Sequence, residues 1–278
     1  MSSCTILKVL QMNRYSDTVT FITGASSGIG AALALEIARQ GGDVALVARR
    51  EERLQKLARE IESMGRRALA IPCDITIDGD PERAAEITIA RFGRINYVVA
   101  NAGFGVAGRL EKLTIEDFRR QFETNVFGVL RTVYATREHL IASRGCLGII
   151  GSINGYIATP RTSAYSMSKF ALHGLAESLR YEFQPHGVGV VLIAPGYVRT
   201  EIRRVDKWGE HHPEMQDRVP AWLQISGEEA ARQIATALQR RQRIKVITGH
   251  GKIAVFMQRH CPGLMSAIIT RLSAKGLI

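Results

Sequence analysis

Short apolar runs rich in β-branched residues alternate along the chain with longer segments whose apolar residues recur at helical spacing. The apolar runs predict strands at residues 19–22, 44–47, 68–71, 97–100, 147–151, 189–194 and 244–248. The intervening segments predict helices at residues 31–39, 51–64, 81–92, 114–143 (one helix, or two in series), 163–184 and 227–241. Alternating strands and helices form βαβ units, and strands without polar positions are covered on both faces. We therefore predict one α/β domain in which a doubly wound parallel sheet lies between two layers of helices.

The segments outside this alternation define the domain boundaries. Residues 1–16 precede the first strand and are predicted to be an N-terminal extension, with Met12 as an alternative natural start. The domain then covers residues 17–250. Within it, residues 197–225 form a connection too long for an ordinary loop, which predicts a substrate lid. Residues 251–278 are predicted to be a basic amphipathic tail, divided into two short helices at Pro262.

The net charge of +11 is concentrated near the end of the chain. Residues 231–278 contain nine Lys or Arg residues and no Asp or Glu. A basic amphipathic tail can lie on a membrane surface, close the mouth of a substrate site or form a dimer contact, and the sequence leaves these three roles open. Nucleic acid is not an expected partner, because the chain has no recognition motif and no pattern of stacking aromatic residues.

Other features of the composition narrow the class of protein. No run of about 18 apolar residues occurs, so no membrane-spanning helix is expected. The four cysteines lie far apart, and the histidines show no metal-ligand spacing, so no metal site is expected. We expect a cytoplasmic protein, with membrane association through the tail as one of the open possibilities.

The turn after the first strand has the composition of a phosphate-binding loop. The sequence TGASSGIG, residues 23–30, joins that strand to the first helix. Its glycines permit a tight turn and a close approach of the backbone to a pyrophosphate, which the helix N-terminus then attracts. The turn therefore predicts a Rossmann-type dinucleotide site. Its expected contacts are Gly24, Ser26, Ser27, Gly28, Ile29 and Gly30.

The residues after the second strand predict which dinucleotide is preferred. This strand ends in Ala48-Arg49-Arg50, where an acidic residue would accept a hydrogen bond from the 2′-hydroxyl of NAD. An arginine in that place accommodates the 2′-phosphate of NADP instead. We expect NADP(H) to be preferred over NAD(H), with Arg49 as the contact. The alternative is that both arginines only cap the next helix.

A tyrosine and a lysine at i and i+4, Tyr165 and Lys169, project from one face of a predicted helix. This spacing alone is common and is typical of a solvated helix face. A free tyrosine has a pKa of about 10, and we expect a neighbouring ammonium to lower it. Tyr165 could then donate a proton to a carbonyl oxygen while hydride adds to the carbon.

Five motifs in order resemble the signature set of the short-chain dehydrogenase/reductase superfamily. They are TGASSGIG, Asn101-Ala102-Gly103, Asn125, Ser152, and Tyr165 with Lys169. The likeness extends from about residue 19 to residue 248, and Ser152 precedes Tyr165 by 13 residues, the usual family interval. One departure is Ala100, where the family often has a second asparagine.

The resemblance implies a role for each matching position. Tyr165 would be the proton donor and Ser152 would polarise the substrate oxygen. Lys169 would also bind the nicotinamide ribose, and Asn125 would order a water that links Lys169 to solvent. Among the other matching positions, Asp74 would contact the adenine amino group, Asn101 and Gly103 would line the adenosine side, and Pro195, Val198 and Thr200 would hold the nicotinamide carboxamide. For Asp74, a role as a helix cap or turn residue is the alternative.

The lid contains five large apolar residues, which suggest a hydrophobic substrate: Trp208, Met215, Val219, Trp222 and Leu223. The alternative is that they only anchor the loop to the core. The pattern is similar to reductases of long-chain lipid ketones, including 3-ketosphinganine reductases. We predict an NADP(H)-dependent oxidoreductase for a ketone or secondary alcohol on a fatty-acyl, sphingoid or steroid-like molecule. The family also pairs through its long fourth and fifth helices, which implies a homodimer or homotetramer.

A second hypothesis is a catalytically silent NADP-binding regulatory protein. The four residues Asn125, Ser152, Tyr165 and Lys169 argue against it, because a silent relative does not need them together.

Overall fold

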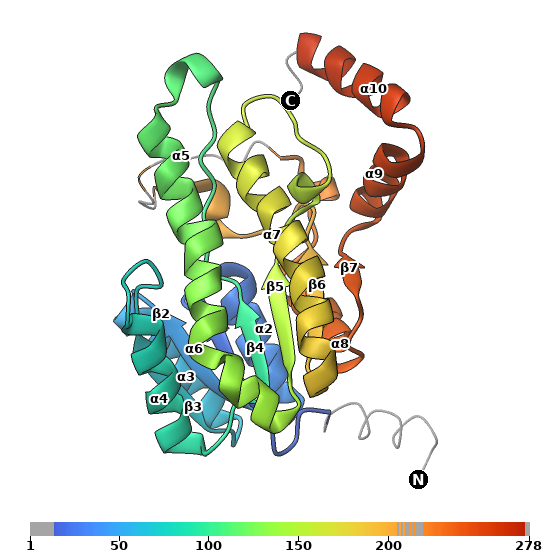
Figure 1. The fold of residues 1–278 in the computed structure, drawn as a ribbon. Helices are drawn as coiled ribbons and strands as arrows, with labels where there is room; N and C mark the ends of the chain where they lie inside the picture. Colours follow the sequence, from blue (N-terminus) through green and yellow to red (C-terminus); the bar gives the residue numbers. More distant parts are fainter. Residues whose placement is uncertain are drawn as a thin grey trace.

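A parallel sheet of seven strands runs through the centre of the molecule (Figure 1). The computed structural model describes residues 14–275 except 205, 207, 209–211, 213 and 215–218. The strands are β1 (Val19–Thr23), β2 (Asp43–Ala48), β3 (Ala68–Pro72), β4 (Tyr97–Ala100), β5 (Cys146–Ile150), β6 (Gly189–Ala194) and β7 (Ile244–Val246). Their spatial order is β3-β2-β1-β4-β5-β6-β7, and every pair is parallel. All seven predicted strands are confirmed.

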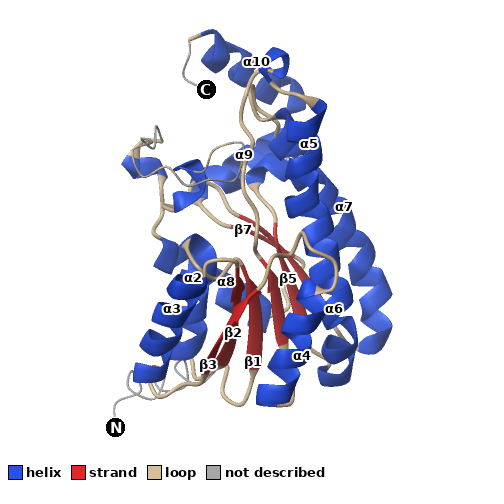
Figure 2. Ribbon diagram, turned by 90° about the vertical axis from the view of Figure 1, so that its left-hand side faces the viewer, coloured by secondary structure: helices blue, strands red, loops and turns tan. Residues whose placement is uncertain are grey.

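Two layers of helices cover the sheet (Figure 2). The first layer contains α2 (Gly28–Arg39), α3 (Glu51–Ser63) and α8 (Gly227–Gln239). The second contains α4 (Asp80–Phe92), α6 (Gly128–Ser143) and α7 (Ser163–Phe183). Each helix buries one apolar stripe, as α3 does with Leu54, Leu57, Ala58 and Ile61, because the opposite stripe is charged and faces water. The predicted doubly wound α/β fold is therefore confirmed.

The predicted helix at 114–143 is a series of three segments. It comprises α5 (Ile115–Phe122), a π-helix η2 (Glu123–Phe127) and α6. A capping box between Thr114 and Asp117 begins α5, because each side chain accepts a hydrogen bond from the backbone of the other residue. The alternative of two helices in series is thus nearer to the structure, and the π-helix between them was not predicted.

The connections reverse direction beside β1. From β1 the chain builds outward through β2 and β3, then crosses back to β4 on the other side. The carboxyl ends of β1 and β4 therefore diverge into opposite layers and leave a crevice, which is where ligands bind in open parallel sheets. Short helices follow the later strands at the same edge. These are η3 (Ile153–Gly155) after β5, and η5 (Glu201–Arg204) and η6 (Ala221–Leu223) within the connection at 197–225 that we predicted to be a lid.

The predicted boundaries need one correction at the amino end. Tyr15, which we assigned to the extension, is fully buried, donates a hydrogen bond to the carbonyl oxygen of Ala235 at 2.7 Å, and packs on the Tyr97 ring. Part of the predicted extension therefore belongs to the core, because this aromatic ring fills a space beside α8. The suggested alternative start at Met12 lies outside the described residues.

The tail contains two helices, as predicted: α9 (Gly249–His260) and α10 (Pro262–Ala274). Val255 of α9 packs on Tyr156 and Ala194 of the domain, whereas no side chain of α10 is buried. Thr248, the N-cap of α9, has φ 71° and ψ 137°, which is a strained conformation for a β-branched residue. In the described part of the chain, no helix has the length and hydropathy needed to cross a bilayer.

Candidate active site

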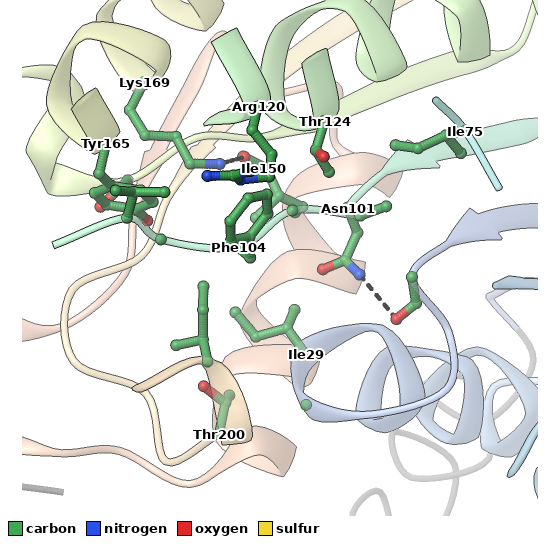
Figure 3. Close-up of a pocket in the computed structure, with 18 of the residues that line it drawn as sticks. Ile29, Ile75, Asn101, Phe104, Arg120, Thr124, Ile150, Tyr165, Lys169 and Thr200 are labelled. Carbon is green, nitrogen blue, oxygen red and sulfur yellow. Dashed lines mark hydrogen bonds between the residues drawn. The ribbon is translucent and has the colours of Figure 1, made fainter. Parts of the chain in front are cut away.

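A cleft of about 1570 Å³ opens at the carboxyl ends of the strands. This volume exceeds the roughly 300–1,000 Å³ of a typical single-ligand pocket, so it has room for a dinucleotide and a second molecule. Figure 3 shows Tyr165 and Lys169 on one side of the cleft and Ile29 and Thr200 on the opposite side. Most predicted site residues line it, namely Gly24, Ser26, Ser27, Gly28, Ile29, Arg49, Asp74, Asn101, Gly103, Ser152, Tyr165, Lys169, Pro195, Val198 and Thr200.

The glycine-rich turn needs its glycines for two different reasons. Gly24 and Gly28 have φ of 66° and 58°, a region that L-residues rarely adopt. At Gly30, an added Cβ would lie 2.5 Å from the Gly24 carbonyl oxygen. Gly30 therefore lies beneath the turn rather than along the cleft, and it lets α2 pack against the loop. The open turn and the amino end of α2 form a cradle that fits a pyrophosphate.

Asn101 holds this turn in place. Its side-chain amide donates to the Thr23 carbonyl oxygen at 2.8 Å and to the Gly24 carbonyl oxygen at 3.3 Å. Its backbone N–H donates to the Thr23 hydroxyl at 3.0 Å. The end of β4 is thereby fixed to the end of β1. Asn101 thus fixes the shape of this end of the cleft as well as lining it.

The two arginines after β2 have different surroundings. The Arg49 guanidinium lies 3.9 Å from the Asp74 carboxylate. Arg50 instead turns toward the glycine-rich turn, where it donates to Ser26 Oγ at 3.0 and 3.1 Å and to Ser27 Oγ at 2.6 Å. Arg50 is the N-cap residue of α3, but no side-chain hydrogen bond caps that helix. We predicted Arg49 as the cofactor contact, whereas Arg50 is the arginine that reaches the glycine-rich turn; the Arg-Arg pair in the sequence was the available signal for it.

Asp74 also serves the local backbone. Its Oδ1 accepts hydrogen bonds from the backbone N–H and the hydroxyl of Thr76 at 2.9 and 2.7 Å. The turn role that was the alternative reading is therefore present. The contact with an adenine amino group stays a prediction, since Asp74 also lines the cleft.

Ser152, Tyr165 and Lys169 come together beside the end of β5. Lys169 is 6% exposed and donates from Nζ to the Ile150 carbonyl oxygen at 2.9 Å. Its Nζ lies 5.6 Å from the centre of the Tyr165 ring, and Ser152 lies close enough to the Tyr165 hydroxyl to lower the pKa of the phenol in part. The i, i+4 spacing on α7 thus directs both side chains into the cleft. The structure excludes the solvated helix face as an explanation for Lys169.

A glycine allows Ser152 to approach α7 this closely. A Cβ on Gly155 would lie 2.8 Å from the backbone oxygen of Lys169. Without a side chain at this position, η3 packs directly on α7. Ser152 is the N-cap of η3, and its Oγ also accepts from the Asn154 N–H at 3.1 Å. Its hydroxyl is thereby held near the phenol.

The electrostatics of the pair differ from our prediction. Burial raises the pKa of Tyr165, while the hydrogen bond with Ser152 and the charge of Arg203 lower it in part. Burial also lowers the pKa of Lys169 to about 8. The expectation that Lys169 brings the Tyr165 pKa below its ordinary value is therefore wrong for the protein itself, because the loss of hydration dominates in this site. The same surroundings keep the phenol protonated, as a proton donor requires.

Asn125 lies in the π-helix and is fully buried. Its Oδ1 accepts from the Phe104 N–H at 3.1 Å, and its Nδ2 donates to the Phe104 carbonyl oxygen at 3.0 Å and to Ser168 Oγ at 3.1 Å. The side chain thus ties the segment after β4 to α7. Its predicted role in ordering a water next to Lys169 stays a prediction. A π-turn leaves one backbone carbonyl without an N–H partner in the helix. Such a carbonyl is suited to accept a hydrogen bond from that water.

The segment that was predicted to hold a nicotinamide follows β6. Pro195, Val198 and Thr200 all line the cleft, and Val198 pairs with Ile225 across the base of the lid. Of the described apolar residues in the lid, Trp208 also lines the cleft, under the guanidinium of Arg120 at 4.3 Å. Trp222, in contrast, is 82% exposed and lies outside the cleft lining. Met215 lies outside the described residues.

Comparisons with known proteins agree with this geometry. Residues 18–210 match the family described as short chain dehydrogenase. The uncharacterized oxidoreductase YxnA of Bacillus subtilis is 36% identical over 217 residues, which cover 76% of this chain and 59% of YxnA. The 11-beta-hydroxysteroid dehydrogenase A of Sesamum indicum is 31% identical over 268 residues, 94% of this chain and 76% of the relative. The alcohol dehydrogenase of the archaeon Thermococcus sibiricus, complexed with 5-hydroxy-NADP, has a TM-score of 0.73 and 30% identity, and the match covers 83% of this chain and 94% of that one.

Proposed function

Because this chain belongs to the short-chain dehydrogenase family, we propose that it is an NADP(H)-dependent oxidoreductase that interconverts a ketone and a secondary alcohol. The observation that carries the proposal is the convergence of Ser152, Tyr165 and Lys169 opposite the glycine-rich turn. One end of the cleft fits a dinucleotide phosphate and the other presents a protonated phenol. Bound between them, the nicotinamide would supply or accept the hydride.

Side chains of this protein donate and accept the proton of the reaction. In the reductive direction, Tyr165 donates its hydroxyl proton to the substrate carbonyl oxygen as that oxygen gains charge. Ser152, which lies beside the phenol, holds and polarises the same oxygen. Lys169 places a cation beside the ring and stabilises the phenolate that remains. The reverse reaction uses the phenolate as the base.

The catalytic assignment is tested with Tyr165→Phe. The variant keeps the ring that fills the site and removes only the proton donor. We expect at least a hundredfold loss of kcat with NADPH and a ketone, and unchanged NADPH binding, since general acid catalysis contributes about 10²–10⁴-fold. Full activity of this variant would refute the assignment. Binding of NADPH without turnover by the wild type, over a broad panel of ketones, would favour the silent regulatory protein.

The preference for NADP(H) is supported by the cations and hydroxyls after β1 and β2. Arg50, Ser26 and Ser27 form a cluster of donors that matches a phosphate, and Arg49 lies beside it. Arg50→Ala should raise the KM for NADPH at least tenfold while that for NADH changes less than twofold. Equal changes for both cofactors would contradict the phosphate site.

We assign a hydrophobic carbonyl compound to the substrate end. Phe104 and Val106 are buried beside Ala164 and pack against Phe118, forming an apolar wall of the cleft. The name of the sesame relative supports steroid and other lipid ketones as the first compounds to test. A screen of steroid, fatty-acyl and sphingoid ketones with NADPH, against small polar ketones, tests this. Higher kcat/KM for the polar ketones would contradict it.

A homodimer through α6 and α7 is proposed as the assembly. The two helices lie side by side on one face of the sheet (Figures 1 and 2). Tyr134 of α6 is 69% exposed, and Phe170 and Tyr181 of α7 are 46% and 62% exposed. Large exposed patches of this kind mark interaction surfaces. Light scattering should give a dimer or a larger even assembly for the wild type and a smaller species for Phe170→Glu.

For the tail, contact with an anionic membrane surface is the role that its charge favours. Ile253 and Phe256 of α9 are 63% and 61% exposed, one helical turn apart, beside the exposed Lys252. Co-sedimentation with phosphatidylglycerol vesicles, and not with phosphatidylcholine vesicles, is the expected result. Equal recovery with both, or with neither, would contradict it.

A further inference from the structure

A carboxylate from the lid lies against the arginines of the cofactor cleft. Glu201 begins η5, at the start of the lid. Its Oε2 is 2.8 Å from Arg53 Nη1 and 3.4 Å from Arg50 Nη1, and its Oε1 is 3.1 Å from Arg53 Nη1. These arginines belong to the start of α3, about 150 positions earlier in the sequence. These contacts therefore join the segment after β6 to the start of α3.

The carboxylate binds the guanidinium that the proposed phosphate site uses. Arg50 directs its Nε and Nη2 to the hydroxyls of Ser26 and Ser27 and its Nη1 to Glu201. Each of its three guanidinium nitrogens thus contacts a serine hydroxyl or the acidic residue. Both Arg50 and Glu201 line the cleft. An anion that enters here meets an anion of the protein already in contact with the same cation.

The local charges let the Glu201 carboxylate compete with a phosphate for the Arg50 guanidinium. Three arginines, Arg49, Arg50 and Arg53, gather where β2 joins α3, and burial and the charge of Arg53 lower the pKa of Arg50. Glu201 supplies a counter-charge to two of them. A phosphate monoester brings a charge of about −1.5 to −2 and three acceptor oxygens. It therefore outcompetes a single carboxylate for Arg50, whereas a 2′-hydroxyl does not compete for it.

We propose that Glu201 is a specificity-determining residue, which lowers the affinity for NADP(H) by occupying Arg50 and is displaced from it only by the 2′-phosphate. The inference rests on the proposed NADP(H)-dependent function. It adds that the dinucleotide with the phosphate is the one that releases Glu201 from Arg50, while the shorter contact with Arg53 remains. NAD(H) leaves the Glu201 contacts intact.

The test compares cofactor affinities of the full-length protein and Glu201→Gln, by fluorescence titration with NADPH and with NADH at low salt. The amide keeps the size of the side chain and removes its charge. We expect NADPH to bind about fivefold more tightly to Glu201→Gln, in the range of one or two partly exposed ion pairs. NADH affinity should change less than twofold. The difference should shrink at high salt, because these charges are partly exposed.

Two further variants separate the possible failures. Glu86→Gln removes the same charge from an exposed position on α4 and should change neither affinity. In an Arg50→Ala background, Glu201→Gln should no longer tighten NADPH binding, since the shared cation is gone. Unchanged or weaker NADPH binding to Glu201→Gln, or equal tightening for both cofactors, overturns the inference. If instead Arg50→Ala weakens NADPH and NADH equally, the phosphate site of the proposed function fails as well.

Discussion

Replacement of Lys169 by methionine should make the protein more stable at neutral pH while it removes activity. The ammonium is 6% exposed, and burial lowers its pKa from 10.5 to about 8. Each pKa unit corresponds to about 1.4 kcal/mol, so holding the charge in this site costs about 3 kcal/mol of folding free energy below pH 8. Methionine has a similar length and no charge, and it avoids this cost.

The same substitution also removes one favourable contact. Lys169 Nζ donates to the Ile150 carbonyl oxygen at 2.9 Å, and a buried carbonyl without a donor costs about 1–2 kcal/mol. The net expectation at pH 7 is therefore a gain of about 1–2 kcal/mol in the free energy of unfolding. An activity loss together with a stability gain would identify Lys169 as a residue kept for chemistry at the expense of the fold.

The pH dependence gives the sign of the effect. The pKa of Lys169 is lower in the folded than in the unfolded chain, so the unfolded state binds more protons between about pH 8 and 10.5. The stability of the wild type relative to Lys169→Met must rise across that window. Above it both states of the wild type carry the neutral amine, the cost disappears, and the wild type becomes the more stable protein through its hydrogen bond.

Urea unfolding of both proteins at pH 7.0, 8.5 and 10.0, at one protein concentration, measures this difference directly. Comparing the two proteins cancels the titration of all other groups. Lys56→Met, an exposed position on α3, controls for the loss of one positive charge. A less stable Lys169→Met protein at pH 7, or a difference that does not vary with pH, would refute the argument from burial.

Two more predictions concern the backbone. Gly30→Ala places a Cβ 2.5 Å from the Gly24 carbonyl oxygen, so it should cost about 1–3 kcal/mol of stability and abolish dinucleotide binding in a fluorescence titration. Gly263→Ala, where an added Cβ meets nothing within 4 Å, is the matched control. Thr248→Gly should be about 1–2 kcal/mol more stable in urea unfolding than Thr248→Ala. Both variants lose the side-chain cap to the Gly251 N–H, but only glycine adopts the φ of 71° without strain. The opposite order of stability would show that the turn is not strained.

Much of the fold follows from local pattern. The apolar strands, the glycine-rich turn and the i, i+4 placement of Tyr165 and Lys169 depend on residues close in sequence, and the structure agrees with them. The π-helix around Asn125 could not be predicted, because it is an irregularity in an otherwise continuous helical pattern. It is held by contacts to Phe104 and Ser168, which lie elsewhere in the sequence.

The electrostatic part of the site was less accessible from sequence. The sequence places Arg49 and Arg50 side by side but does not show which guanidinium reaches Ser26 and Ser27. The contact of Glu201 with Arg53 joins two segments that only the folded sheet brings together. The direction of the Tyr165 pKa was also wrong, because burial, a tertiary property, outweighs the charge of its neighbour.

The helix α10 differs from the rest of the chain in how far packing constrains its sequence. None of its 13 residues is buried, although Met265 and Ile269 rest partly against the cluster around Tyr156. Packing therefore constrains the residues of this helix less than it constrains those of the sheet. Among orthologues, the rate of substitution in α10 should follow the turnover of whatever surface it meets, while the rate in the cleft follows the chemistry. A slow rate of substitution in both α10 and the cleft would indicate that the surface which α10 contacts and the chemistry of the cleft each constrain the sequence.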